Sequence, residues 1–158
     1  MIDKKKFYIN GEWIDAKGKE SIKVIDPSTE KSCAEISLGN KDDVNNAVIA
    51  AKKAYESWGF SSKEERIKLL ENLYVLYKKR WADIASAITM EMGAPKDFAT
   101  KLQAGTGASH IKSFIRYLKE FEFEKPLGEH APDQRIIYEP KGVCCLLYTS
   151  PSPRDLDL

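Results

Sequence analysis

The sequence predicts a mainly helical protein that carries a β-hairpin near its amino terminus. Apolar residues recur at steps of three and four over residues 41–58 and 62–92, and less regularly over 97–121, which indicates three amphipathic helices. Asn10 and Gly11 separate two β-prone runs, which is typical of a tight hairpin turn. Short runs of alternating polar and apolar residues lie between this hairpin and the first helix.

The chain begins with a basic cluster, Lys4 to Lys6, which we interpret as a solvated terminus. The hairpin follows over residues 7–14. Because Asn and Gly both tolerate positive φ, a type I′ turn is expected. In that geometry Tyr8 lies opposite Trp13 on the neighbouring strand.

Two further strands are expected before the first helix. One covers residues 21–25 and ends at Asp26 and Pro27, which favour a turn. The other covers residues 33–38, where every second residue is apolar. Cys33 falls on its polar-facing side, and no basic residue is adjacent to it in the sequence. We therefore interpret Cys33 as a structural residue.

The first helix, over residues 41–58, has a start signal and an expected partner. Asn40 and Asp43 have the spacing of a capping box, which satisfies two otherwise unpaired backbone amides. Small alanines on the helix allow close approach to the one that follows. Only residues 59–61 separate the two, so we expect them to pack roughly antiparallel.

The longest helix is expected over residues 62–92, which contain neither Gly nor Pro. Ser62 and Glu65 form a second capping box, and Gly93 provides the stop because it can adopt positive φ. A kink or break is expected near Asp83. The apolar stripe must be buried against something, and it consists of Ile67, Leu70, Leu73, Tyr74, Tyr77, Trp81, Ile84, Ala85 and Ile88.

The third helix, over residues 97–121, contains a small-residue run at Gly105–Gly107. A dinucleotide-binding fingerprint needs a third Gly and a preceding strand, and both are missing here. We interpret these residues as a helix–helix contact. Residues 120–132 are interpreted as a loop, and residues 135–138 as a short strand.

Composition and charge exclude several functional classes. The chain is 42% hydrophobic and 31% charged, as in an ordinary globular protein. A net charge of +1 provides no broad attraction to nucleic acid or to an anionic membrane, so neither is expected as a partner. No apolar run approaches a membrane span or a signal-peptide core, and three scattered cysteines form no disulfide framework, so a cytoplasmic location is expected.

The residues that usually carry chemistry form no recognisable pattern. His110 and His130 are not at metal-ligand spacing from the adjacent pair Cys144 and Cys145. His110 has no carboxylate partner nearby in the sequence, which favours a packed or surface histidine. We therefore expect no catalytic, no cofactor-binding and no metal-binding residue within the chain.

Several short motifs follow one another in a specific order between Phe7 and Val143. They are Tyr8 to Trp13, Ile25 to Glu30, Asp42 to Val44 with Ala47, Ala50, Ala51 and Trp58, Glu65 and Arg66 with Leu69 and Leu70, Glu91 to Pro95, and Tyr138 to Val143. In order and spacing they resemble the amino-terminal region of the aldehyde dehydrogenase superfamily. The resemblance implies an incomplete, amino-terminal part of an α/β aldehyde dehydrogenase-like fold.

The resemblance also implies an activity for the full-length parent, the oxidation of an aldehyde to a carboxylic acid with NAD or NADP. In the family a cysteine thiolate attacks the carbonyl, an asparagine and a backbone amide hold the oxyanion, and a glutamate activates the hydrolytic water. That cysteine and glutamate come well beyond residue 158, so Cys144 and Cys145 are not interpreted as nucleophiles. The chain itself is expected to be inactive and to bind no cofactor, and the parent is expected to be a homo-oligomer.

By the same resemblance, residues 1–128 are the amino-terminal part of a cofactor-binding domain, and residues 129–143 begin an oligomerisation arm and the next strand. Residues 144–158 are interpreted as a non-native tail, because residues 145–155 read CLLYTSPSPRD, which is similar to the translation of a transposase-type sequencing adapter. Glu91 matches an acidic residue near which family members often hold a monovalent cation, and a solvated or capping role is left open for it. His110 falls near the family's substrate tunnel, which does not identify a substrate.

An alternative interpretation is a short, non-catalytic interaction module that binds a full-length aldehyde dehydrogenase. The two interpretations differ in what they predict for the surface. A truncated enzyme leaves the apolar faces of its helices exposed and aggregates when it is expressed alone. A genuine module is soluble and unfolds cooperatively.

Overall fold

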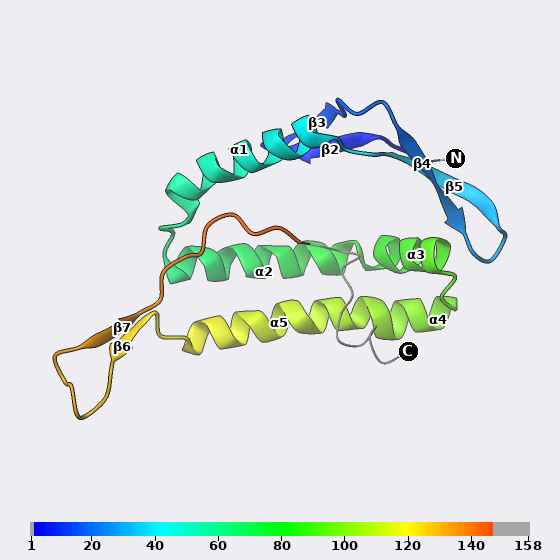
Figure 1. Cartoon of the computed structure of the whole chain (residues 1–158). Helices are drawn as coiled ribbons and strands as arrows, with labels where there is room; N and C mark the ends of the chain where they lie inside the picture. The colour runs from blue at the N-terminus through cyan, green and yellow to red at the C-terminus, as the bar shows by residue number, and fades with distance from the viewer. Residues whose placement is uncertain (1, 147–158) are drawn as a thin grey trace.

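The computed structural model describes residues 2–146, which form two layers. The strands β1 to β5 and helix α1 make one layer, and α2, α3 and α5 make the other (Figure 1). The elements are β1 (Ile2–Lys4), β2 (Lys6–Ile9), β3 (Glu12–Asp15), β4 (Ser21–Asp26), β5 (Lys31–Ser37), α1 (Lys41–Trp58), α2 (Lys63–Lys79), α3 (Trp81–Met92), α4 (Lys96–Phe98), the π-helical η1 (Ala99–Gln103), α5 (Ala104–Glu120), β6 (Glu124–Pro126) and β7 (Arg135–Ile137). Most of the tail predicted over residues 144–158 lies outside the described residues.

The predicted hairpin is confirmed. Strands β2 and β3 pair antiparallel, and the turn residues Asn10 and Gly11 have φ values of 54° and 83°, as a type I′ turn requires. Tyr8 pairs with Trp13, and their ring centres are 5.2 Å apart. The local sequence was sufficient here because the turn alone determines the register.

The three-stranded sheet has the order β1-β5-β4 and contains a strand that the sequence did not indicate. The lysines Lys4 to Lys6 are exposed, as expected for a solvated cluster, but they do not belong to a free terminus. Lys4 lies in β1, which pairs parallel with β5, and the Lys5 ammonium lies 3.0 Å from a Glu35 carboxylate oxygen. The physical reason is that β1 covers the backbone groups of β5 along an edge that would otherwise be open.

Both predicted capping boxes are present, and α1 covers the predicted residues 41–58. The long helix breaks at Arg80, whose φ of −101° and ψ of 16° interrupt the helical geometry between α2 and α3. Gly93 ends α3 with a φ of 68°, and a Cβ at this position would lie 2.8 Å from Pro27. Glycine is therefore needed here both for the backbone conformation and for the close approach of the β4–β5 turn.

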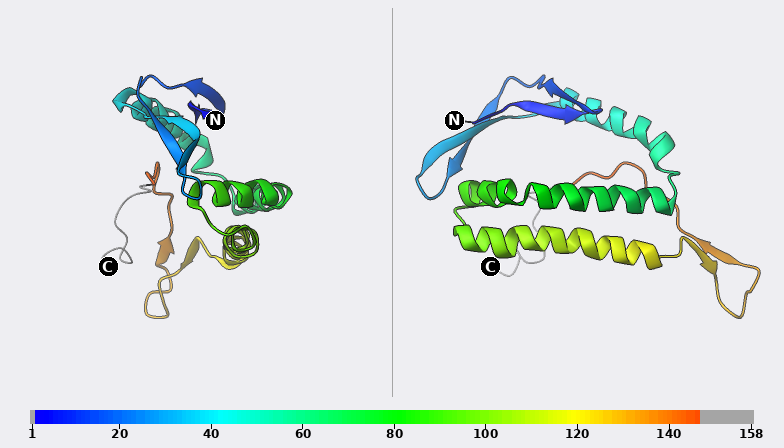
Figure 2. Two further views of the ribbon diagram at one scale, coloured as in Figure 1. Left: turned by 90° about the vertical axis from the view of Figure 1, so that its right-hand side faces the viewer. Right: turned by 180° about the vertical axis from the view of Figure 1, so that it is seen from behind.

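The expected antiparallel packing of α1 on α2 is wrong. Helix α2 packs against α5 instead, and α1 diverges from α2 and contacts the hairpin strand β2 (Figure 2). The Tyr77 hydroxyl donates to the Ala104 carbonyl at 3.0 Å, and Gly107 lies directly against the Tyr77 ring. Tyr77, in the apolar stripe of the long helix, therefore meets α5, whereas Leu73 of the same stripe is exposed. The interpretation of Gly105–Gly107 as a helix–helix contact is confirmed.

The interpretation of residues 120–132 as a loop is wrong for residues 124–126. These form β6, which pairs antiparallel with the predicted strand β7. The pairing is supported by an ion pair between Arg135 and Glu124 at 3.2 Å, a contact between residues far apart in sequence. Residues 138–146 form no regular element.

The core of the described chain is small. Its buried apolar residues are all alanines, and among the described residues no large side chain is fully buried. They are Ala34, Ala85, Ala94, Ala99, Ala104 and Ala108. Among the described residues, no helix is long and apolar enough to cross a membrane.

Candidate functional site

The residues that could carry chemistry lie apart in the structure. The Cys33 thiol, in β5, donates to the Val24 carbonyl at 3.4 Å, and Cys144 and Cys145 are exposed. His110 is exposed on α5, and Glu91 is exposed at the end of α3. Within residues 2–146, no group of three or more His, Cys, Asp or Glu side chains is placed to hold a metal ion.

The small-residue run of α5 does not form a nucleotide site. Gly105 faces Trp81 and Gly107 faces Tyr77, so both belong to the contact between helices. A phosphate cradle needs a glycine loop between a strand and the start of a helix, with its amides open to the ligand. The run Gly105–Gly107 therefore provides no phosphate cradle of this kind.

The most buried ionisable residue holds a loop in place. Asp43 is 4% exposed, and its carboxylate accepts hydrogen bonds from the amides of Asn40 (3.0 Å), Lys17 (2.8 Å) and Gly18 (3.0 Å). These bonds lower the pKa of Asp43 below its ordinary value, and the bond from Asn40 contributes most. The capping box predicted the bond from Asn40. Nothing in the sequence indicated the other two, which fix the residues before β4 to the start of α1.

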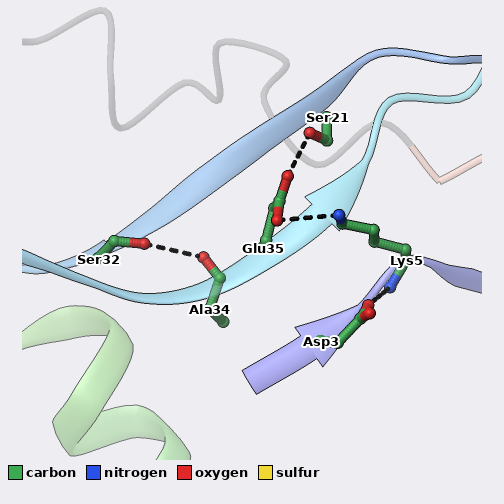
Figure 3. A network of polar contacts seen from close by, with 6 residues as sticks. All are labelled: Asp3, Lys5, Ser21, Ser32, Ala34 and Glu35. Atoms are coloured by element: carbon green, nitrogen blue, oxygen red, sulfur yellow. Dashed lines mark hydrogen bonds and ion pairs between the residues drawn. The ribbon is translucent and has the colours of Figure 1, made fainter. Parts of the chain in front are cut away.

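A second polar cluster joins the strands of the three-stranded sheet (Figure 3). Glu35 in β5 accepts a hydrogen bond from the Ser21 hydroxyl of β4 and pairs with Lys5, which follows β1. The Lys5 amide in turn donates to Asp3 at 3.0 Å. The bond from Ser21, followed by that from Lys5, lowers the pKa of Glu35. Since Glu35 connects β5 with Ser21 of β4 and with Lys5 next to β1, we interpret the cluster as a support of the sheet.

Helix α2 carries large apolar side chains that no other described element covers. Leu69, Leu73 and Leu76 are 53%, 45% and 56% exposed along a side of α2 that α5 does not cover. We refer to these three leucines as the leucine stripe. Beyond it, a shallow hollow of about 420 Å³ continues along α3. Its lining residues are Leu73, Leu76, Tyr77, Arg80, Asp83, Ile84 and Ala87.

Helix α1 is also poorly covered, since Val44 and Ile49 are exposed and its main contact with another helix or strand is with β2 of the hairpin. Exposed large apolar side chains that gather on a helix face are typical of an interface with other protein. The candidate functional surface of the described chain is therefore an unfilled packing interface and not a reaction pocket.

Comparison with known proteins identifies the family. The model of the aldehyde dehydrogenase family matches residues 13–149. The chain belongs to the aldehyde dehydrogenase family. The predicted fold is confirmed as well, because the structure superposes on an aldehyde dehydrogenase from Bartonella henselae with a TM-score of 0.80 and 49% sequence identity, over 82% of this chain and 27% of that one.

Other relatives give the same assignment. The chain is 40% identical to a 3-succinoylsemialdehyde-pyridine dehydrogenase of a Pseudomonas species, over 93% of this chain and 30% of that protein. It superposes on an aldehyde dehydrogenase of Pseudomonas syringae, solved with NAD+ and octanal, with a TM-score of 0.76 and 33% identity, over 78% of this chain and 26% of that one. The chain thus spans about 30% of the length of the curated relatives it matches.

Proposed function

We propose that this chain is the amino-terminal part of an enzyme that oxidises an aldehyde to a carboxylic acid with NAD or NADP. The catalytic cysteine and glutamate belong to parts of the enzyme that the chain does not contain, so the chain alone is inactive. The observation that carries the proposal is coverage: 93% of this chain aligns with 30% of a dehydrogenase.

The cofactor belongs to the parent enzyme and is not bound by this part. The Pseudomonas syringae relative was solved with NAD+ and octanal, which supports a nicotinamide cofactor and an aldehyde substrate for the parent. The helix contacts of Gly105 and Gly107 support the view that residues 2–146 provide no dinucleotide cradle. The nicotinamide accepts the hydride when it is bound, and the residues described here contribute packing surface instead.

The same proposal assigns roles to the segments. Residues 1–128 form the first part of the cofactor-binding domain, residues 129–143 begin the arm through which the parent forms a homo-oligomer, and residues 144–158 are a non-native tail. The exposed leucine stripe supports the first role, since it leaves a face for further protein to cover. Three free cysteines support a cytoplasmic enzyme.

Separate assays of purified residues 1–158 and of a full-length relative, under the same conditions, test the activity. With octanal and NAD+, the relative is expected to form NADH and the isolated chain is not. Aldehyde-dependent NADH formation by the isolated chain would contradict the proposal. If the isolated chain is a soluble monomer that unfolds cooperatively, the result would instead support the interaction module.

A long sequencing read across codon 144 tests the proposed non-native tail. Natural coding sequence through residue 158 would show the tail to be native.

A further inference from the structure

The orientation of the β6–β7 hairpin relative to α2 and α5 depends on contacts outside the hairpin. It projects past the end of the α2–α5 pair (Figures 1 and 2), and among the described elements its strands pack extensively only on each other. An isolated two-stranded hairpin is marginally stable in water. The contacts at its base therefore determine how firmly it is held against the helices.

Arg66, near the start of α2, lies at that base. Its Nη2 donates to the Gly59 carbonyl at 2.8 Å, and its Nε donates to the Ser61 hydroxyl at 2.9 Å. Its guanidinium carbon lies 5.6 Å from the centre of the Phe123 ring, just before β6. A planar guanidinium can donate within its plane while one of its faces lies against an aromatic ring. One side chain thus connects the α1–α2 linker with the root of the hairpin.

The contact continues from ring to ring to Tyr138, the residue directly after β7. Phe123 meets Phe121 edge to face at 4.9 Å, and Phe121 meets Tyr138 at 5.2 Å. The Tyr138 amide donates to the Phe123 carbonyl at 2.8 Å, and Lys125 lies over the Tyr138 ring at 5.7 Å. Both ends of the hairpin are therefore tied to the ring that Arg66 contacts.

Two further contacts bring the neighbouring helices to the same point. The Lys63 ammonium donates to the carbonyls of Lys119 (3.1 Å) and Phe121 (3.3 Å), at the end of α5. The Tyr55 hydroxyl of α1 donates to the Pro140 carbonyl, after β7, at 3.2 Å. Arg66 lies among these contacts and contacts both the linker and the Phe123 ring.

We propose that Arg66 is a positioning residue that fixes the direction of the β6–β7 hairpin relative to the α2–α5 pair. Ile137, in β7 of this hairpin, is 64% exposed. Lysine is a poor replacement here, because its ammonium lacks the planar guanidinium that donates to Gly59 and Ser61 within its plane while one face lies on the Phe123 ring. This role rests on contacts within the chain and does not depend on the proposed enzymatic function.

Hydrogen exchange of the full 158-residue chain, followed by mass spectrometry, tests the proposal. In Arg66→Ala and Arg66→Lys, amides that close the hairpin, such as those of Leu127 and Tyr138, are expected to exchange about tenfold faster, while those of β4 and β5 are unchanged. Lys78→Ala is the matched control, because it removes a cation–π contact with Tyr74 in the same helix, and it is expected to leave the hairpin amides as in the wild type.

A second variant distinguishes loss of the contact between Arg66 and Phe123 from a general loss of stability. Phe123→Leu keeps the apolar volume but removes the ring face, so it is expected to speed exchange at the same hairpin amides. Wild-type protection of the hairpin in both Arg66→Ala and Phe123→Leu would overturn the proposal. So would faster exchange that is equal throughout the chain, or full protection in Arg66→Lys.

Discussion

Replacing Gly107 with alanine tests the contact between α2 and α5. A Cβ at this position would lie 2.9 Å from Tyr77 Cζ and 3.3 Å from Tyr77 Cε2, closer than normal packing allows. The Tyr77 ring is not free to move away. Its hydroxyl donates to the Ala104 carbonyl at 3.0 Å, and it meets Trp81 edge to face with ring centres 6.2 Å apart.

The expected magnitude follows from two opposing effects. Alanine favours the helix over glycine by about 1 kcal/mol. Overpacking costs about 1–3 kcal/mol, and loss of the tyrosine hydrogen bond adds about 1 kcal/mol. We therefore expect Gly107→Ala to lower the free energy of unfolding by about 1–3 kcal/mol. Gly105→Ala is the matched control, because its nearest neighbour, Trp81, is 3.9 Å away and only the helix preference changes. It is expected to stabilise the chain by about 1 kcal/mol.

Urea unfolding of the wild type and both variants, followed by far-UV circular dichroism, measures these differences. The two substitutions change the same residue type in the same helix, so their opposite signs isolate the tyrosine contact. In a Tyr77→Ala background the clash is absent, and Gly107→Ala is expected to become stabilising. Equal stabilisation by both glycine substitutions in the wild-type background would refute the packing described here.

Three further predictions concern other parts of the chain. Because the pKa of Asp43 is lowered from an ordinary value of 3.8, its contribution to stability is present above that pH and is lost as the pH falls through the lowered pKa. Thermal unfolding should show Asp43→Asn destabilised at neutral pH, with the difference from the wild type shrinking in acid. Trp81→Phe removes the hydrogen bond to the Thr100 carbonyl at 3.0 Å and is expected to cost about 1 kcal/mol in urea unfolding. Leu76→Lys changes an exposed position of the leucine stripe and is expected to change the free energy of unfolding by less than about 0.5 kcal/mol. It is expected to reduce self-association, measured by size-exclusion chromatography. An unchanged elution profile would count against the stripe as an interface.

Features determined by neighbouring residues could be predicted from the sequence. The bounds of α1, both capping boxes and the type I′ turn depend on residues within four positions of one another. The stop at Gly93 is of the same kind, although its contact with Pro27 is not. Such local chemistry leaves a clear pattern, because caps and turns each require particular residue types.

Features that depend on distant pairing could not be predicted. The parallel pairing of β1 with β5 brings Lys5 to Glu35, thirty residues away, and no local pattern indicates it. Helix α2 packs against α5 and not, as the sequence predicted, against α1. An apolar stripe indicates that a helix face is buried but does not indicate which element buries it. The π-helical turn over Ala99–Gln103 left no signal either, since its residue types also suit an α-helix. For the candidate site, the sequence indicated long apolar stripes, but only the structure located the uncovered leucines.

The alanine core has a calorimetric consequence. Heat capacity rises on unfolding mainly because hydrocarbon becomes hydrated, by about 12–15 cal/mol/K per residue in ordinary globular domains. Six buried methyl side chains release little hydrocarbon, and the larger apolar groups are already partly wet in the folded chain. The isolated chain should therefore show a smaller increment per residue and a flatter dependence of its stability on temperature. Covering the helices with the remainder of a dehydrogenase would restore the usual curvature.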